Sequence, residues 1–181
     1  MNIPVDSVTT KGSSGEFTTY TGIFDNTKQH KQGVLDLLTE VVQGVNEKTP
    51  SVVKVTVPDV ILRLRARKLY LVYTVDSEDT PVGLLIFSVT KRSSAGEDFV
   101  IADSTYLLSK VDGVLDLLIV SFAYVCQILG VTQIVSETAR TGLAHKLKTY
   151  KPRTENSVRS FYSPELMLQS DTAKQLTATI S

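Results

Sequence analysis

Residues 99–135 constrain the fold of this chain more than any other stretch. Residues 101–108 have the β-branched and aromatic content of a strand, and a polar turn with one glycine follows them. Residues 114–129 are almost unbroken hydrophobe, and residues 133–137 have a second strand pattern. The pattern predicts a strand, a turn, an apolar helix and a second strand, with the rest of the chain packed around this unit.

The apolar run 114–131 is about as long as the shortest segment that crosses a bilayer. Asp116 and Gln127 interrupt the run, and Asp112 stands at its start. An aspartate in mid-span costs about 3 kcal/mol in a membrane. We therefore interpret this run as a core helix covered on most sides, and we expect no membrane partner.

Overall charge and length indicate one ordinary globular domain. The 181 residues are enough to bury a core, and 19 basic and 19 acidic side chains cancel. Nucleic acid is not an expected partner, because no stacking aromatic residues stand among Arg63, Arg65 and Arg67, which we interpret as a solvated helix face. Cys126 is expected to be a small buried hydrophobe. Without paired cysteines or a leader-like start, a cytoplasmic location is expected.

The order of the expected elements indicates an α+β fold. Helices are predicted from apolar residues spaced three and four apart, and strands from β-branched and aromatic runs that end in turn-forming residues. The order lacks the regular alternation of a doubly wound sheet and contains no internal repeat. The predicted strands are 17–24, 69–75, 82–90, 101–108, 133–137 and 157–162, and the predicted helices are 27–47, 60–69, 114–129 and 141–150.

Three parts are expected along the chain. Residues 1–16 are small and polar, and we expect a flexible N-terminal arm or one that a partner orders. Residues 17–165 are expected to form the domain. Residues 166–181 are weakly patterned and are expected to be a C-terminal tail, with a final strand or a contact arm as alternatives.

The succession of elements over residues 17–163 resembles the GNAT superfamily of N-acyltransferases, which use acetyl-coenzyme A. In that family a turn of the form Arg/Gln-x-x-Gly-x-Gly/Ala joins a strand to a helix, and its amides bind the cofactor pyrophosphate. Residues 110–115 lie at this junction, where Lys110 keeps a positive charge and Gly113 keeps one glycine. Unpaired amides and the helix dipole both favour an anion there. The resemblance implies a GNAT-like, mainly antiparallel central sheet flanked by helices, acetyl-coenzyme A as cofactor and an amine as acceptor.

Two residues of this turn depart from the family pattern. Leu115 puts a branched side chain where the family has glycine or alanine, and Asp112 adds a negative charge beside the expected pyrophosphate. Both changes are expected to weaken coenzyme A binding. A structural turn with Asp112 as helix cap is the alternative. The residues that the resemblance assigns to cofactor binding are Leu108, Lys110, Gly113, Val114 and Leu115.

The resemblance also implies a base for the amine and an acid for the leaving thiolate. Asp103 is the candidate base, since it shares a strand face with Ile101 and Thr105, where desolvation would raise the pKa of its carboxyl group; the polar side of a bend is the alternative. Tyr150 is the candidate acid, because a phenol with a pKa of about 10 suits proton transfer to a thiolate, and a structural tyrosine is the alternative. His145 is a further candidate base or a water-facing residue. Without a Cys or His cluster, no metal site is expected.

Two functions are weighed on this basis. The first is an N-acyltransferase that moves an acetyl group from acetyl-coenzyme A to an amine. The second is a non-catalytic protein of the same fold that contacts a protein partner, or a second copy of itself, through its terminal segments. Residues 147–149 give a short similarity to acyltransferase-like bacteriophage proteins, including virion components, so a virion is the alternative location. An RNA-binding domain ranks below both.

The transferase assignment depends on the corner at Gly113. It requires that the backbone amides there open to solvent and that the third and fourth central strands, 101–108 and 133–137, part beside the corner. If Leu115 filled this corner, or if the sheet had no gap there, the transferase assignment would fail and only the expected fold would remain.

Overall fold

One eight-stranded sheet forms the centre of the computed structural model, which describes residues 10–11, 17–22, 24–48, 54–94, 97–137, 141–150, 154–155 and 159–177. The strand order is β1-β2-β3-β4-β5-β6-β8-β7, and every neighbouring pair is antiparallel except β5 and β6. The expected α+β fold with a mainly antiparallel sheet is confirmed. The strands are β1 (Thr10–Lys11), β2 (Thr18–Gly22), β3 (Tyr70–Val75), β4 (Pro81–Ser94), β5 (Glu97–Ser109), β6 (Gln133–Glu137), β7 (Thr154–Glu155) and β8 (Arg159–Tyr162).

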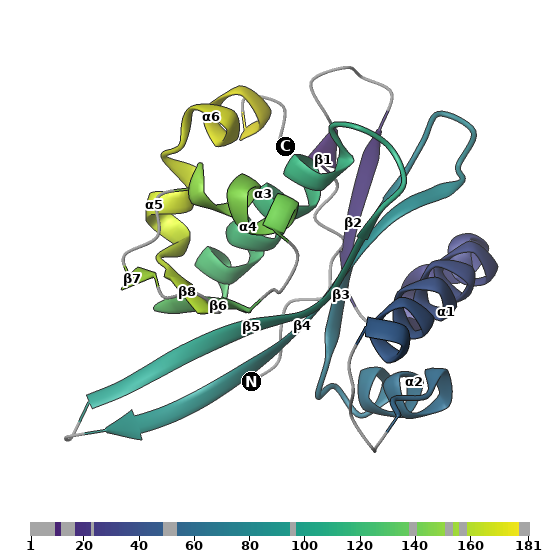
Figure 1. Ribbon diagram of the computed structural model, residues 1–181, viewed down its shortest axis with the longest axis horizontal. Coiled ribbons are helices and arrows are strands. Elements are labelled where there is room, and N and C mark those ends of the chain that lie inside the picture. Colours follow the sequence, from purple (N-terminus) through teal and green to yellow (C-terminus); the bar gives the residue numbers. More distant parts are fainter. Residues whose placement is uncertain are drawn as a thin grey trace.

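Helices cover both faces of the sheet. Figure 1 shows α1 and α2 on one side and the helices from α3 to α6 on the other. The long strands β4 and β5 cross between the two layers and extend beyond them as a two-stranded arm. The helices are η1 (Phe24–His30, a 3-10 helix), α1 (Lys31–Lys48), α2 (Val57–Arg65), α3 (Val114–Ile128), α4 (Thr141–Lys148), α5 (Pro164–Leu168) and α6 (Asp171–Thr177).

The central strands are buried on both faces, which explains their continuous apolar sequence. In β4, Leu84 and Ile86 join the apolar cluster under α1 and α2, whereas Leu85 and Phe87 join the cluster under α3. Successive side chains of a strand point to opposite faces, so one apolar run serves two helical layers. Successive side chains of β4 therefore point alternately into the two helical layers, rather than alternately into the core and the solvent.

Helix α3 is the core helix that the sequence predicts. Most of its side chains are buried, including Leu118 and Cys126, which are fully enclosed. Its first turn lies directly on β4 at Gly83, where an added Cβ would come within 2.4 Å of Val114 Cγ1 and 3.0 Å of Leu118 Cδ1. The absence of a side chain at Gly83 thus fixes where α3 begins against the sheet.

The C-terminal segment corrects one expectation. Residues 166–181 are not a tail over their described part, because α5 and α6 pack on α3 and bury Met167 and Ala173 in its cluster. Helices this short contain too few apolar residues for a 3.6-residue period to show. Two local signals were nevertheless present: Pro164 stands in the first turn of α5, and the Ser170 hydroxyl accepts a hydrogen bond from the Ala173 amide at the start of α6 (3.2 Å).

Boundaries elsewhere in the chain also differ from the prediction: α2 ends at Arg65 rather than at residue 69, and a 3-10 helix precedes α1. Polar residues 91–97 were expected to form a loop, but β4 continues to Ser94 and β5 begins at Glu97, paired throughout. The two strands of the projecting arm pair through their backbones and need no apolar face, so the polar sequence of this segment did not indicate a strand. Within the expected N-terminal arm, Thr10–Lys11 pairs with β2; residues 1–9 and 12–16 lie outside the described residues.

The sheet parts between β5 and β6. These parallel strands pair only from Ile101 opposite Gln133 to Ser104 opposite Ser136. A β-bulge at Thr105 follows, because Ile86 pairs with Tyr106 and Phe87 with Ser104. Beyond the bulge, residues 106–109 pair with β4 and not with β6. The turn to α3 therefore follows a segment of β5 that pairs with β4 on one side and no longer pairs with β6 on the other.

Candidate functional site

The turn from β5 to α3 leaves the start of the helix open. Gly113 is the N-cap residue, with a left-handed φ of 85° that favours glycine, and no side chain caps the helix. Two hydrogen bonds stabilise the turn: the Lys110 amide donates to the Val82 carbonyl oxygen of β4 (2.9 Å), and the Ser109 hydroxyl donates to the Val111 carbonyl oxygen (2.9 Å). An uncapped helix start presents free amides and a partial positive charge.

An open cavity of about 350 Å³ lies over this turn. Gly113 is exposed, and apart from the adjacent residues of the chain no described residue has an atom within 4 Å of the position its Cβ would take. Leu115 stands at the edge of the cavity with its side chain partly packed on the α3 cluster, so it does not plug the corner. The lining residues are Ser109, Lys110, Val111, Asp112, Gly113, Leu115, Asp116 and Lys146.

Asp116 ties α4 to the first turn of α3. The Tyr150 hydroxyl donates to Asp116 Oδ1 (2.6 Å), and Lys146 Nζ lies 2.7 Å from Asp116 Oδ2. Burial, assisted by the bond to Asp116 and its negative charge, raises the pKa of Tyr150 far above that of a free phenol. Tyr150 is fully buried and holds its proton on Asp116, so donation to a thiolate would first require this bond to break. Its catalytic role stays a prediction.

A second, much smaller cavity lies where β5 and β6 part. Its volume is about 20 Å³, roughly enough for one water molecule. Ser104 and Ser136 stand at its polar side, where their hydroxyls are 3.4 Å apart. Side chains from α3, α4, α5 and β8, including Leu147 and Tyr162, close the rest. An acyl arm that enters between the strands would have to displace some of these side chains.

The other predicted site residues lie apart from both cavities. Asp103 is exposed on β5, between Ser88 and Val135 in the sheet register, and His145 is exposed on α4. Leu108 packs in the cluster under α1 and α2, and Val114, the first residue of α3, is fully buried. Only the backbones of these two residues could therefore meet a ligand. The structure brings Lys110, Gly113 and Leu115 together but leaves Asp103, His145 and Tyr150 dispersed.

Sequence reasoning missed Asp116 and Lys146 as members of this site. Lys146 lies in the last turn of α4, and Tyr150 lies in the turn that follows it, four residues further along the sequence. Their common partner on α3 lies 34 residues from Tyr150, and no local pattern reports such a contact. For Asp116 itself, the sequence signal is its place as an acidic residue in the first turn of α3.

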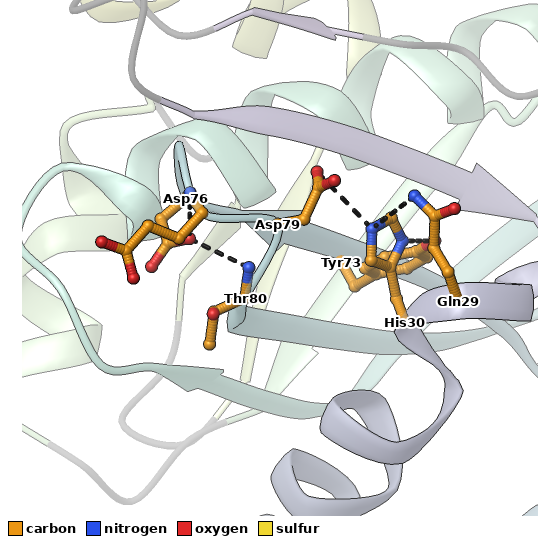
Figure 2. Close-up of polar contacts among 7 residues, drawn as sticks. Gln29, His30, Tyr73, Asp76, Asp79 and Thr80 are labelled. Carbon is orange, nitrogen blue, oxygen red and sulfur yellow. Dashed lines mark hydrogen bonds and ion pairs between the residues drawn. The ribbon is translucent and has the colours of Figure 1, made fainter.

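A separate polar cluster lies on the α1 side of the sheet (Figure 2). His30 Nδ1 and the Tyr73 hydroxyl are hydrogen-bonded at 3.0 Å, and His30 Nε2 lies 3.8 Å from an Asp79 carboxylate oxygen. Asp79 has a left-handed φ of 59° in a turn closed by Asp76, whose carboxylate accepts from the Thr80 amide (2.9 Å). Burial, followed by the nearby Tyr20, raises the pKa of Tyr73 to about 12. The cluster ties η1 to β3 and lines neither cavity.

The described residues form neither a metal centre nor a membrane-spanning helix. No group of three or more His, Cys, Asp and Glu side chains in these ranges is placed to hold a metal ion. None of the helices in the same ranges is long and apolar enough to cross a membrane.

Comparison with solved structures finds acetyltransferases at low sequence identity. An aminoglycoside acetyltransferase from an uncultured soil metagenomic sample, in complex with sisomicin, superposes with a TM-score of 0.61 at 13% identity, over 80% of this chain and 93% of that one. A mutant AtaT toxin bound to the C-terminus of the antitoxin AtaR and acetyl-CoA gives 0.57 at 11% identity, over 85% and 97%. Glucosamine-6-phosphate N-acetyltransferase from Arabidopsis thaliana gives 0.55 at 9%, over 78% and 95%.

Sequence comparison adds nothing to this likeness. No protein family description matches the chain, and no curated protein matches it. The likeness is therefore one of overall architecture, with sequence identities of only 9–13%. By its structure, this chain has the fold of the GNAT acetyltransferases.

Proposed function

We propose that the chain is an N-acyltransferase that moves an acetyl group from acetyl-coenzyme A to an amine. The observation that carries the proposal is the open cavity of about 350 Å³ over the uncapped start of α3, in a fold shared with acetyltransferases. One structural neighbour is bound to acetyl-CoA, and others are an aminoglycoside and an amino-sugar acetyltransferase. These likenesses support an acyl-coenzyme A and an amine as substrates.

The chain's own residues fit the phosphate part of this cofactor. The open turn offers helix-start amides for an anion, and Lys110 and Lys146 add positive charge at the cavity wall. Asp112 and Asp116 oppose them, so we expect weaker binding than an intact family turn would give. The pairing of β5 with β6 ends at Ser104 and Ser136, and we propose that the acyl arm reaches the sheet beyond this last pair.

The transfer needs one proton removed and one supplied. Acetyl-coenzyme A, when bound, supplies the acetyl group as a reactive thioester. Asp103, exposed on β5, is the proposed base for the attacking ammonium, with His145 on α4 as the alternative. Tyr150 is the proposed acid that returns a proton to the sulfur, once its hydroxyl leaves Asp116. The balance is one amide bond formed and one thioester bond broken.

Transfer is tested by thiol release from acetyl-coenzyme A in the presence of a panel of amines, with acetylated product identified by mass spectrometry. Amine-dependent release by the wild-type protein, reduced at least about tenfold in Asp103→Asn as expected for loss of a general base, supports the proposal. Release without any amine dependence, or none across polyamine, aminoglycoside and amino-sugar acceptors, contradicts it.

A second candidate is a non-catalytic protein of this fold that acts through its interactions. The cavity at the strand parting, of only about 20 Å³, and the engagement of Tyr150 with Asp116 favour this candidate. Binding of acetyl-coenzyme A without transfer to any amine would support it. The virion location, suggested by the similarity of residues 147–149 to bacteriophage proteins, stays a prediction.

A further inference from the structure

The two lysines of the cavity over the α3 turn have different partners. Lys110 Nζ lies 2.7 Å from Glu40 Oε2 of α1, and both side chains are about half exposed, at 45% and 51%. Lys146 Nζ lies 2.7 Å from Asp116 Oδ2, and the Asp116 side chain is only 17% exposed. Lys110 is therefore paired at the surface with the opposite helical layer, whereas Lys146 is held at the cavity wall.

Asp116 fixes the position of the Lys146 ammonium group. One carboxylate oxygen accepts from the buried Tyr150 hydroxyl, and the other faces Lys146. Lys146 lies in the last turn of α4, and Tyr150 lies in the turn that follows this helix. A lysine ammonium has three donors, and a single carboxylate oxygen uses one. Lys146 can therefore keep Asp116 and still donate to a second anion in the cavity.

We propose that Lys146 binds the phosphate groups of the acyl carrier and so selects a phosphorylated carrier. This inference rests on the proposed function. The charged side chains that line the cavity are Lys110, Asp112, Asp116 and Lys146, which cancel formally. Each lysine has one carboxylate partner at 2.7 Å, and the Lys146–Asp116 pair is the less exposed, at 39% and 17% against 45% and 51% for Lys110 and Glu40. Lys146 is therefore the cation whose position at the cavity wall is fixed before an anion enters. It takes the charge role that the family assigns to the first residue of the turn.

The test is the affinity of acetyl-coenzyme A for the wild-type protein, Lys146→Gln, Lys146→Arg and Lys148→Gln, by isothermal titration at two salt concentrations. Lys148 is a matched control because it is an exposed lysine of the same helix outside the cavity lining. Loss of a charge-assisted hydrogen bond to phosphate should weaken binding about tenfold or more in Lys146→Gln. Its affinity should also depend less on salt, while Lys146→Arg and Lys148→Gln stay near wild type.

The outcomes separate the two proposals. An affinity and a salt dependence of Lys146→Gln equal to those of Lys148→Gln would overturn the role of Lys146 while leaving the proposed function intact. Wild-type protein that does not bind acetyl-coenzyme A at all would overturn the proposed function, and the role of Lys146 would fall with it. Circular dichroism of each variant checks that the fold is kept.

Discussion

At the scale of single residues, the start of α3 depends on two glycines for different reasons. Gly83 provides space, because a Cβ there would overlap Val114 of the helix. Gly113 provides conformation, because its φ of 85° lies in the left-handed region while the space around it is open. Gly83 lets α3 pack closely on the sheet, and Gly113 lets the backbone adopt the turn that lines the cavity.

The role of Gly113 predicts a loss of both stability and binding in Gly113→Ala. The left-handed backbone should cost alanine about 1–2 kcal/mol in the free energy of unfolding, measured by urea denaturation. Gly130→Ala is the matched control, since Gly130 has a φ of 66° and the same free space but lies beyond the far end of α3. Both variants should lose similar stability, and only Gly113→Ala should bind acetyl-coenzyme A more weakly. Equal binding by the two would contradict this role of the turn.

The role of Gly83 predicts a different kind of loss. An added methyl group at Gly83 meets Val114 and Leu118, so Gly83→Ala should destabilise the protein by about 1–3 kcal/mol through overpacking. Urea denaturation measures the change. The loss in the double variant Gly83→Ala with Val114→Ala should be smaller than the sum of the two single losses, because the shorter side chain makes room. Additive losses would mean that the contact with Val114 is not the cause.

At the scale of elements, periodicity predicted the layers and failed at short or polar segments. The 3.6-residue pattern of α1, the apolar run of α3 and the apolar runs of β3 and β4 were enough to predict the element order and the α+β class, because each element buries many side chains. Helices α5 and α6 bury few and went unrecognised. The turn at Gly113 was found from its glycine, whereas the contact of Asp116 with Tyr150 and Lys146 joins elements distant in sequence and left no pattern.

The packing of α5 on α3 predicts that the C-terminal segment contributes to stability. Met167 is 2% exposed in the α3 cluster, so Met167→Ala should lower the free energy of unfolding by about 2–5 kcal/mol. Gln169→Ala, an exposed change at the end of the same helix, should stay within about 0.5 kcal/mol of wild type. Chemical denaturation compares the two, and equal midpoints would show that α5 is not part of the core.

At the scale of the whole molecule, buried phenols predict how stability depends on alkaline pH. The pKa of Tyr73 is raised to about 12, so the folded state keeps a proton that the unfolded state releases from about pH 10. Stability from this group is fully present below about pH 10 and is lost as the pH rises toward about 12. Urea midpoints measured across this range should fall, and less steeply in Tyr73→Phe. An identical slope in the two proteins would exclude Tyr73 as a contributor.

The architecture of the whole molecule makes one requirement of the proposed function: the cavity over Gly113 must bind acetyl-coenzyme A. The direct measurement is the melting temperature with and without this cofactor. At a hundredfold excess over its dissociation constant, a ligand adds about 2.7 kcal/mol of stability, which corresponds to a rise of about 5–10 °C for a domain of this size. We predict such a rise for the wild-type protein and a smaller one for Gly113→Ala. An unchanged melting temperature at millimolar acetyl-coenzyme A would contradict the assignment.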